Sequence, residues 1–312
     1  MRFRDFVGVA KPWLAAANLV TAGAGFFLGC GGAVAWGTFF AALAGIGLVV
    51  AAGCVANNCI DSRLDRAMAR TRARAMAAGR MPLGVGLVYA AGLGFFGTAV
   101  LAVWTTPATV AVTLGGFVVY VGVYSAWLKR RSPASTVIGS LAGAAPPLAA
   151  YCAAGGSFDM GAGMVLALFC LWQVPHSYAV TLHRFDDYAA AGVPVLPVRQ
   201  GFDATRRHIV WHIAAFTLAA ALLGVLGYAG KAYLAVAIVS GACWLAVALH
   251  GYSAALARGW GRRVYLASIV VVCLLALALA LDPAERSGAA SQPADARPPK
   301  ADRLLTACPS RR

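Results

Sequence analysis

The sequence predicts an all-α polytopic membrane protein. Of its 312 residues, 61% are hydrophobic and only 12% are charged, and the mean hydropathy is +0.74. Apolar runs of about 20 residues recur along the chain, and a run of that length can cross a bilayer as a helix. Because most connections between these runs are short, we expect one compact bundle of nine transmembrane helices rather than two domains.

The nine predicted spans together form a single transmembrane domain, residues 1–281. They cover residues 12–32, 37–57, 83–103, 107–127, 135–154, 161–181, 208–228, 232–252 and 263–281. The first follows basic residues, as a signal peptide would, but its apolar stretch is too long and no suitable cleavage site follows, so we expect it to be retained. Residues 282–312 are rich in Pro, Ala, Ser and Arg, which predicts a disordered tail.

The fifth span differs from the others in composition. Gly139 and Gly143 are followed by Pro146 and Pro147. Glycines at that spacing let helices approach closely, and consecutive prolines disturb a helix. We therefore expect a bent or interrupted helix beside a cavity.

The net charge of +15 would suit a nucleic-acid-binding protein, but the distribution of the basic residues indicates another origin. They concentrate before the first span and in 58–80, 127–132, 183–207 and 253–263, which lie on one side if the spans alternate. This is the positive-inside pattern, which sets orientation in a membrane. We expect a cytoplasmic N-terminus, a tail on the opposite, periplasmic side, contact with membrane lipid, and no nucleic-acid partner.

The first polar motif begins at the predicted end of the second span, with Asn57 and Asn58. Asp61 and Asp65 follow, and a spacing of four residues places both carboxylates on one helix face. Such a pair favours a bound cation, and Mg²⁺ is usually held by one or two carboxylates together with water and phosphate. The arginines at 70, 72 and 74 suit an anionic ligand at the membrane surface, which implies a phosphate head and an apolar tail. The alternative is a basic loop whose acids are merely solvated.

The second motif lies at the end of the fourth span. Tyr120, Tyr124 and Trp127 precede Lys129 and Arg130. Aromatic and basic residues also anchor helices at a membrane interface, which is the alternative here. The functional interpretation is a clamp on a leaving diphosphate, with aromatic faces that shelter a carbocation.

The third motif ends the sixth span with Trp172, Gln173, His176 and Tyr178. A lone histidine on an apolar helix is more often a packed side chain than a ligand. Several polar groups at membrane depth nevertheless indicate a cavity. The adjacent acids Asp186 and Asp187 are candidates for a second metal site opposite the first.

Three segments carry a resemblance to a known family: NNCIDSRLDRAMART, YVGVYSAWLKRRSPASTVIGSLAGAAPPLAAYC and LWQVPHSYAVTLHRFDDYAAAGVPVLPV. Together they resemble the protohaem IX farnesyltransferases (haem O synthases), a branch of the intramembrane aromatic prenyltransferases, over about residues 5–281. The resemblance implies a ring of nine helices around a central cavity. It also implies transfer of a farnesyl group from farnesyl diphosphate to a vinyl group of haem B, which gives haem O.

The resemblance assigns a role to each motif. Asp61 and Asp65 would hold Mg²⁺ against the diphosphate, with Asn57 or Asn58 as a further oxygen ligand. Lys129, Arg130, Arg70 and Arg74 would neutralise the departing charge, and Tyr124, Trp172, Gln173, Tyr178, Asp186 and Asp187 would line the substrate site. His176 is the expected haem contact and a candidate axial ligand, while the alternative is that it orients the diphosphate or a metal-bound water.

The resemblance also implies a place in the cell. The sequence is most similar to enzymes that serve bo-type quinol oxidases in proteobacteria, so we expect the bacterial inner membrane, with haem-copper oxidase assembly or haem A synthase as partners.

This sequence departs from the family pattern at two places. The quinone-modifying relatives have a second DxxxD, but no acid lies four residues after Asp186 or Asp187. Ala75 follows Arg74 where a proline is common, which affects only the shape of that segment.

Three other functions remain open at this point. The first is the same transfer to a quinone precursor or another aromatic acceptor. The second is a non-catalytic carrier or haem chaperone, which would explain a cavity with His176 but not the paired aspartates and basic residues. The third is a proton-coupled transporter, which is disfavoured because none of the 11 acidic residues lies in the middle of a predicted span.

Overall fold

The computed structural model describes residues 1–31, 34–155, 158–253 and 256–282, and the predicted tail from 283 onward lies outside this part. Nine helices in the described residues are long and apolar enough to cross a membrane, as predicted. They are α2 (Pro12–Gly29), α3 (Trp36–Ala67), α4 (Leu83–Trp104), α5 (Pro107–Val118) with its continuations η1 (Val119–Trp127) and η2 (Leu128–Arg130), α6 (Ser135–Gly155), α7 (Met160–His183), α9 (Leu196–Val225), α10 (Lys231–Leu249) and α11 (Ala257–Leu281). Two short helices, α1 (Phe3–Ala10) and α8 (Phe185–Ala190), lie outside the spans.

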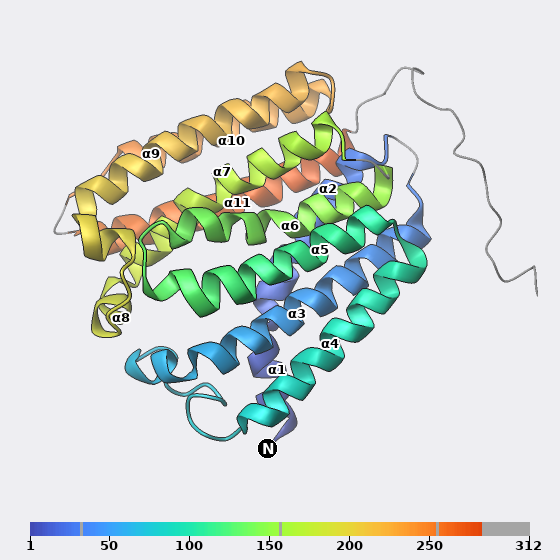
Figure 1. The fold of residues 1–312 in the computed structure, drawn as a ribbon. Coiled ribbons are helices and arrows are strands. Elements are labelled where there is room, and N and C mark those ends of the chain that lie inside the picture. The colour runs from blue at the N-terminus through green and yellow to red at the C-terminus, as the bar shows by residue number, and fades with distance from the viewer. Residues whose placement is uncertain (32–33, 156–157, 254–255, 283–312) are drawn as a thin grey trace, which may run out of the picture.

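The long helices form a closed ring. Each packs against the next along the chain, and α11 returns to contact α2 (Figure 1). The largest apolar core joins α6, α7, α9, α10 and α11, and a smaller one joins α2, α3 and α6. The ring of nine helices expected from the sequence is therefore confirmed.

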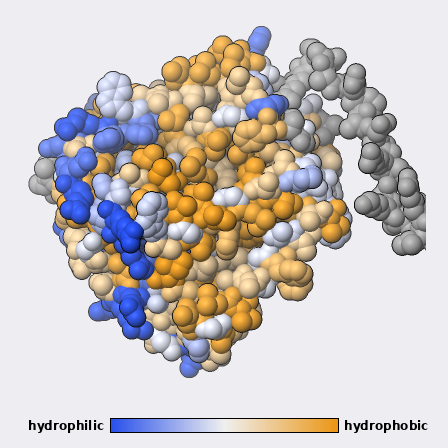
Figure 2. Space-filling model, viewed as in Figure 1, coloured by the Kyte–Doolittle hydropathy of each residue, from blue (hydrophilic) through white to orange (hydrophobic). Residues whose placement is uncertain are grey.

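The outer surface of the ring is apolar. On α4, for example, Val88 is 75% exposed and Phe95 is 70% exposed. Figure 2 shows hydrophobic residues over most of one face, while hydrophilic residues gather along the edge where Figure 1 places α8, the end of α3 and the beginning of α9. A broad apolar surface bounded by a polar edge is what a lipid-embedded bundle requires.

Two helices extend well beyond the spans predicted from hydropathy. The second predicted span ended at residue 57, but α3 continues to Ala67 and carries the whole first motif. The seventh was predicted to begin at 208, but α9 begins at Leu196 and has a non-helical break at Gly201, where φ is 81°. Both extensions are polar, so hydropathy detects the membrane-crossing part of each helix and misses the rest.

The fifth predicted span is α6, which lies beside a cavity as expected. Gly139, Gly143 and Pro146 line that cavity. The helix runs from Ser135 to Gly155 with Pro146 and Pro147 inside it, so the expected interruption is absent. Close packing on both sides of the prolines accounts for this, because eight consecutive residues of α6 around them, Ala144–Tyr151, are buried.

Two glycines of α2 let this helix pack closely against α6. A Cβ atom on Gly25 would collide with the backbone of Pro147, and one on Gly29 would lie 2.6 Å from the carbonyl oxygen of Tyr151. By contrast, a Cβ on Gly23 would meet nothing within 4 Å. The small residues of α2 thus set the distance between two helices that both line the cavity.

We predict that Gly25→Ala lowers the free energy of unfolding by about 1–3 kcal/mol, because α2 and α6 must separate to accept the methyl group. Gly23→Ala is the matched control on the same helix, and we expect it to be neutral or to stabilise by up to about 1 kcal/mol, since alanine is the better helix former. Thermal unfolding of the purified variants in one detergent measures both. Equal melting temperatures for the two variants would contradict the close approach.

Candidate active site

The carboxylates of the first motif occupy successive turns of α3. Asn57, Asp61 and Asp65 are spaced by four residues and share one face, and all three are at least 96% buried. The Nδ2 atom of Asn57 donates a hydrogen bond to Asp61 Oδ2 at 2.8 Å, so the amide and the carboxylate lie side by side. Burying two carboxylates this deeply is costly unless cations accompany them.

Asp61 meets the two cations that the second motif supplied. Lys129 Nζ lies 2.5 Å from Asp61 Oδ2, and an Arg130 Nη atom lies 3.4 Å from Asp61 Oδ1. Arg130 also donates to the carbonyl oxygen of Ile60 at 2.8 Å, which ties η2 to α3. The first and second motifs, whose contacting residues Asp61 and Lys129 are 68 positions apart in the sequence, therefore form one site.

The segment that leads into η2, η1, is a π-helix, a rare form that often marks functional sites. Within it, Ser125 Oγ donates to the carbonyl oxygen of Tyr120 at 2.8 Å and accepts from Asn57 Nδ2 at 3.0 Å. The rings of Tyr120 and Tyr124 stack with centroids 6.1 Å apart. The π-helix therefore presents two tyrosine rings beside the carboxylates.

Asp65 is held from the segment that follows α3. Both of its carboxylate oxygens accept hydrogen bonds from one Arg74 Nη atom, at 3.0 and 2.9 Å. The Thr71 hydroxyl donates to the backbone carbonyl of Asp65 at 3.0 Å and holds the chain close to the helix end. Arg74 thus contacts the carboxylate pair, while Arg72 is exposed.

Lys11 is a fourth cation of this site, and the sequence reasoning missed it. It lies between α1 and α2 with a left-handed backbone (φ 51°), and its Nζ atom donates to Asn57 Oδ1 at 2.7 Å. Burial lowers the pKa of Lys11 to about 8. A lysine just before the first span is what the positive-inside rule expects, so the sequence carries no separate signal for this role.

The two asparagines of the first motif face opposite ways. Asn58 Nδ2 donates to the carbonyl oxygens of Val9 and Cys54, at 2.9 and 2.8 Å, so this side chain fastens α1 to α3. Only Asn57 shares the face of the carboxylates. Its Oδ1 atom, however, is occupied by Lys11, which leaves Asp61 and Asp65 as the oxygen donors of this face.

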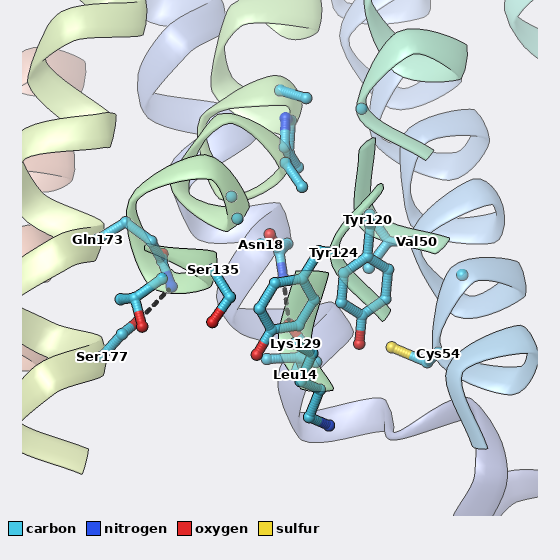
Figure 3. Close-up of a pocket in the computed structure, with 18 of the residues that line it drawn as sticks. Leu14, Asn18, Val50, Cys54, Tyr120, Tyr124, Lys129, Ser135, Gln173 and Ser177 are labelled. Atoms are coloured by element: carbon cyan, nitrogen blue, oxygen red, sulfur yellow. Dashed lines mark hydrogen bonds between the residues drawn. The ribbon is translucent and has the colours of Figure 1, made fainter. Parts of the chain in front are cut away.

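A cavity of about 300 Å³ adjoins the charged cluster and runs between α3, η1, α6 and α7. Figure 3 shows Tyr120, Tyr124 and Lys129 on one side of it, with Gln173 and Ser177 on the facing helix. Gln173 donates to Ser177 Oγ at 3.1 Å. The cavity therefore joins the second motif to the third.

His176 lies at the α7 side of the cavity, next to Trp172. The two rings stack with centroids 4.9 Å apart, and His176 Nδ1 lies 2.6 Å from Ser268 Oγ on α11. Tyr178 is not brought to this site: it is 3% exposed and its ring packs against His208 on α9. The reason is helical geometry, since residues two apart on a helix face different directions.

Asp186 and Asp187 separate in the structure. Asp187 lies 3.7 Å from Arg70, which links α8 to the segment after α3. Asp186 points outward, 71% exposed, and pairs with Arg258 at 2.6 Å. In the described residues no group of three His, Cys, Asp or Glu side chains is placed to hold a metal ion.

The charge balance defines what the cluster can bind. Four cationic side chains, Lys11, Arg74, Lys129 and Arg130, surround the two buried carboxylates. The excess positive charge favours a multiply charged anion, and its partial burial strengthens that attraction. Two carboxylates on adjacent turns also fit Mg²⁺, provided that the anion and water supply its remaining oxygen ligands.

Comparison with known proteins agrees with a site for a multiply charged anion. Residues 18–269 match the UbiA prenyltransferase family. The chain is 47% identical over 279 residues to "Protoheme IX farnesyltransferase" of Chromohalobacter salexigens, covering 89% of this chain and 95% of that protein. It is 46% identical over 282 residues to "Protoheme IX farnesyltransferase 2" of Pseudomonas aeruginosa PAO1, covering 90% and 95%.

Solved structures with little sequence identity share the fold. A UbiA homologue from Archaeoglobus fulgidus bound to DMAPP and Mg²⁺ aligns with a TM-score of 0.64 at 13% identity, over 89% of this chain and 99% of that one. A structure of digeranylgeranylglyceryl phosphate synthase aligns with a TM-score of 0.71 at 14% identity, over 89% and 97%. The family match spans most of the nine-helix ring and both halves of the site, so the chain belongs to the UbiA prenyltransferase family.

Proposed function

We propose that this protein transfers a farnesyl group from farnesyl diphosphate to a vinyl group of haem B and so forms haem O, with a Mg²⁺ ion held by Asp61 and Asp65. One observation carries the proposal: a single cavity extends from Lys129, which pairs with the buried Asp61, to His176. Relatives more than 40% identical over nine-tenths of the chain carry the name of this activity.

The charged cluster would bind the diphosphate head. Mg²⁺, when bound, supplies charge neutralisation between the carboxylates and the diphosphate oxygens. Lys129 and Arg130 would face the oxygen that leaves, while Arg74 and Lys11 would hold the distal phosphate. Electrostatic stabilisation of this kind is usually the largest catalytic contribution, at about 3 kcal/mol for one donor. A UbiA homologue of the same fold that binds DMAPP and Mg²⁺ supports the binding of a prenyl diphosphate with Mg²⁺.

The reaction itself needs no covalent enzyme intermediate. The bond between the allylic carbon and the diphosphate oxygen breaks, and the electron pair stays with the diphosphate. The vinyl group of haem B then forms a carbon–carbon bond to the allylic carbon, and water adds a hydroxyl group to the remaining cation and loses a proton. The stacked faces of Tyr120 and Tyr124 border the cavity beside Lys129 and would shelter the allylic cation.

The acceptor would lie at the His176 end of the cavity. A neutral imidazole is a common ligand of haem iron, and His176 is the one histidine that lines the cavity among the described residues. We therefore assign His176 as the axial contact to the substrate iron, with Trp172 stacked behind it. Gln173 and Ser177 lie beside it and would contact the porphyrin edge.

We place the protein in the bacterial inner membrane, with the N-terminus in the cytoplasm and the C-terminus in the periplasm. The support is the positive-inside distribution of Lys and Arg, together with the polar edge in Figure 2 that lies at the charged cluster. Haem O is a haem for terminal oxidases, so the partners we propose are haem-copper oxidase assembly or haem A synthase.

The deciding experiment is mass spectrometry of haem extracted after the purified protein is incubated with haem B, farnesyl diphosphate and Mg²⁺. We expect a product that carries one farnesyl and one hydroxyl group, and we expect chelation of Mg²⁺ to abolish it. Unmodified haem from folded, haem-binding protein would overturn the acceptor assignment. Prenylation of a quinone precursor in a parallel reaction would then identify the alternative acceptor, whereas no prenyl transfer to either would favour a haem carrier.

A further inference from the structure

The polar contact behind His176 lies in an otherwise apolar part of the bundle. Ser268 belongs to α11 and is fully buried. Its Oγ atom lies 2.6 Å from His176 Nδ1 and 2.6 Å from the backbone carbonyl oxygen of Tyr265. The backbone carbonyl of Ser268 itself accepts a hydrogen bond from Trp172 Nε1 at 2.9 Å. One residue of α11 thus contacts both aromatic side chains of the third motif.

The hydrogen atoms of this contact can be assigned from the chemistry of its partners. A carbonyl oxygen only accepts hydrogen bonds, so the single hydroxyl hydrogen of Ser268 is donated to Tyr265. Ser268 Oγ then presents a lone pair to His176, and Nδ1 must be the donor. In a neutral ring with the proton on Nδ1, the other nitrogen, Nε2, has a free lone pair.

The orientation of the ring follows from the same contacts. Nδ1 faces α11, and Trp172 stacks on one ring face with an interplanar angle of 23°. The edge of Tyr265 approaches the ring at a centroid distance of 5.9 Å. His176 lines the cavity, its Nδ1 atom is turned toward α11, and Nε2 has no hydrogen-bond partner among the described residues, so Nε2 remains available to a ligand in the cavity.

We propose that Ser268 is a positioning residue that fixes His176 as the Nδ1–H tautomer and presents Nε2 to the iron of the haem substrate. The second half of this proposal rests on the proposed function, whereas the tautomer does not. Histidines that bind metals generally donate their other ring hydrogen to such a partner, and loss of the partner typically weakens metal binding 10- to 100-fold. Sequence reasoning missed Ser268, because an isolated serine in an apolar span has no recognisable signal.

The tautomer is tested on the protein alone, by ¹⁵N NMR of selectively histidine-labelled protein in detergent. The chain has five histidines, and His176→Asn identifies the His176 signals by their disappearance. We expect a protonated Nδ1 and an unprotonated Nε2 in the wild type, and a shift toward the other tautomer in Ser268→Ala. An unchanged His176 tautomer in Ser268→Ala would overturn the positioning role.

The functional half is tested by titrating the same proteins with haem B and recording the absorption spectrum. We expect Ser268→Ala to bind about 10- to 100-fold more weakly and to alter the iron-ligand bands. Ser240→Ala is the matched control: Ser240 is also buried in an apolar span, but its hydroxyl has no hydrogen-bond partner among the described residues. It should bind haem as the wild type does.

The two halves of the proposal can be overturned independently. If Ser268→Ala shifts the tautomer but binds haem B with wild-type affinity and spectrum, the iron-binding half is overturned. If His176→Asn has the wild-type haem spectrum, axial ligation by His176 is wrong, and the proposed function loses this contact while the NMR result stands. If Ser268→Ala and Ser240→Ala weakened haem B binding equally, the loss would come from general packing of the bundle, and the proposal would also be overturned.

Discussion

Replacing Asp61 by asparagine is expected to reduce the rate of haem conversion about 1,000-fold at saturating substrates. Asn57, Lys129 and Arg130 all bind this buried carboxylate, and it is one of only two acids on the site face of α3. Asparagine keeps the size and one oxygen but removes the charge. The proposed Mg²⁺ ion would then lose a ligand and the two cations would lose their counter-ion, so the diphosphate would be held less firmly in line for reaction.

Asp203→Asn is the matched control for this prediction. Asp203 is also an acid near a helix end, and it is exposed. Its Oδ1 atom accepts a hydrogen bond from the Tyr252 hydroxyl at 2.7 Å, and the amide oxygen of asparagine can still accept that bond. We expect wild-type turnover from it. Both variants are assayed by the same mass-spectrometric conversion, with melting temperatures to show that they are folded. Turnover of Asp61→Asn within tenfold of the wild type would remove Asp61 from the catalytic role.

The membrane-spanning architecture could be predicted from the sequence because it depends on a local property, the length of each apolar run. All nine spans were found on that basis. The same reasoning failed at polar helix ends: α3 and α9 extend past the hydrophobic region, and α1 was not predicted at all. Hydropathy reports where lipid begins, but hydrogen bonding of the backbone continues a helix beyond it.

Helical spacing predicted part of the geometry of the candidate site. A period of four residues placed Asp61 and Asp65 on one face and, by the same spacing, distinguishes Asn57 from Asn58. The spacing also shows why Tyr178 does not join His176 and Gln173. Grouping residues by closeness in sequence was the weaker argument, since neighbours on a helix point in different directions.

The residues that escaped prediction act through contacts between distant segments. Lys11 reaches Asn57 across 46 positions, and Ser268 reaches His176 across 92. Neither residue type is unusual at its place in the sequence. Each becomes informative only because the ring brings α2 beside α3 and α11 beside α7.

Removal of the Lys129 charge tests whether the cations around Asp61 act on the leaving diphosphate. Its Nζ atom lies 2.5 Å from Asp61 and 5.9 Å from the centre of the Tyr124 ring, at the edge of the cavity. We predict that Lys129→Met lowers kcat about 100- to 1,000-fold while the KM for farnesyl diphosphate changes less than tenfold. The reason is that negative charge on the leaving diphosphate grows as the bond breaks, so the cation stabilises the transition state more than the bound substrate.

A measurement of Mg²⁺ binding without substrate separates this role from that of Asp61. Lys129 and Mg²⁺ would compete for the same carboxylate, so Lys129→Met should bind Mg²⁺ at least as tightly as the wild type, whereas Asp61→Asn should bind it more weakly. Lys231→Met is the matched control, because Lys231 is exposed at the start of α10. If Lys129→Met instead weakened Mg²⁺ binding together with turnover, the lysine would be supporting the metal site, and its assignment to the leaving diphosphate would be wrong.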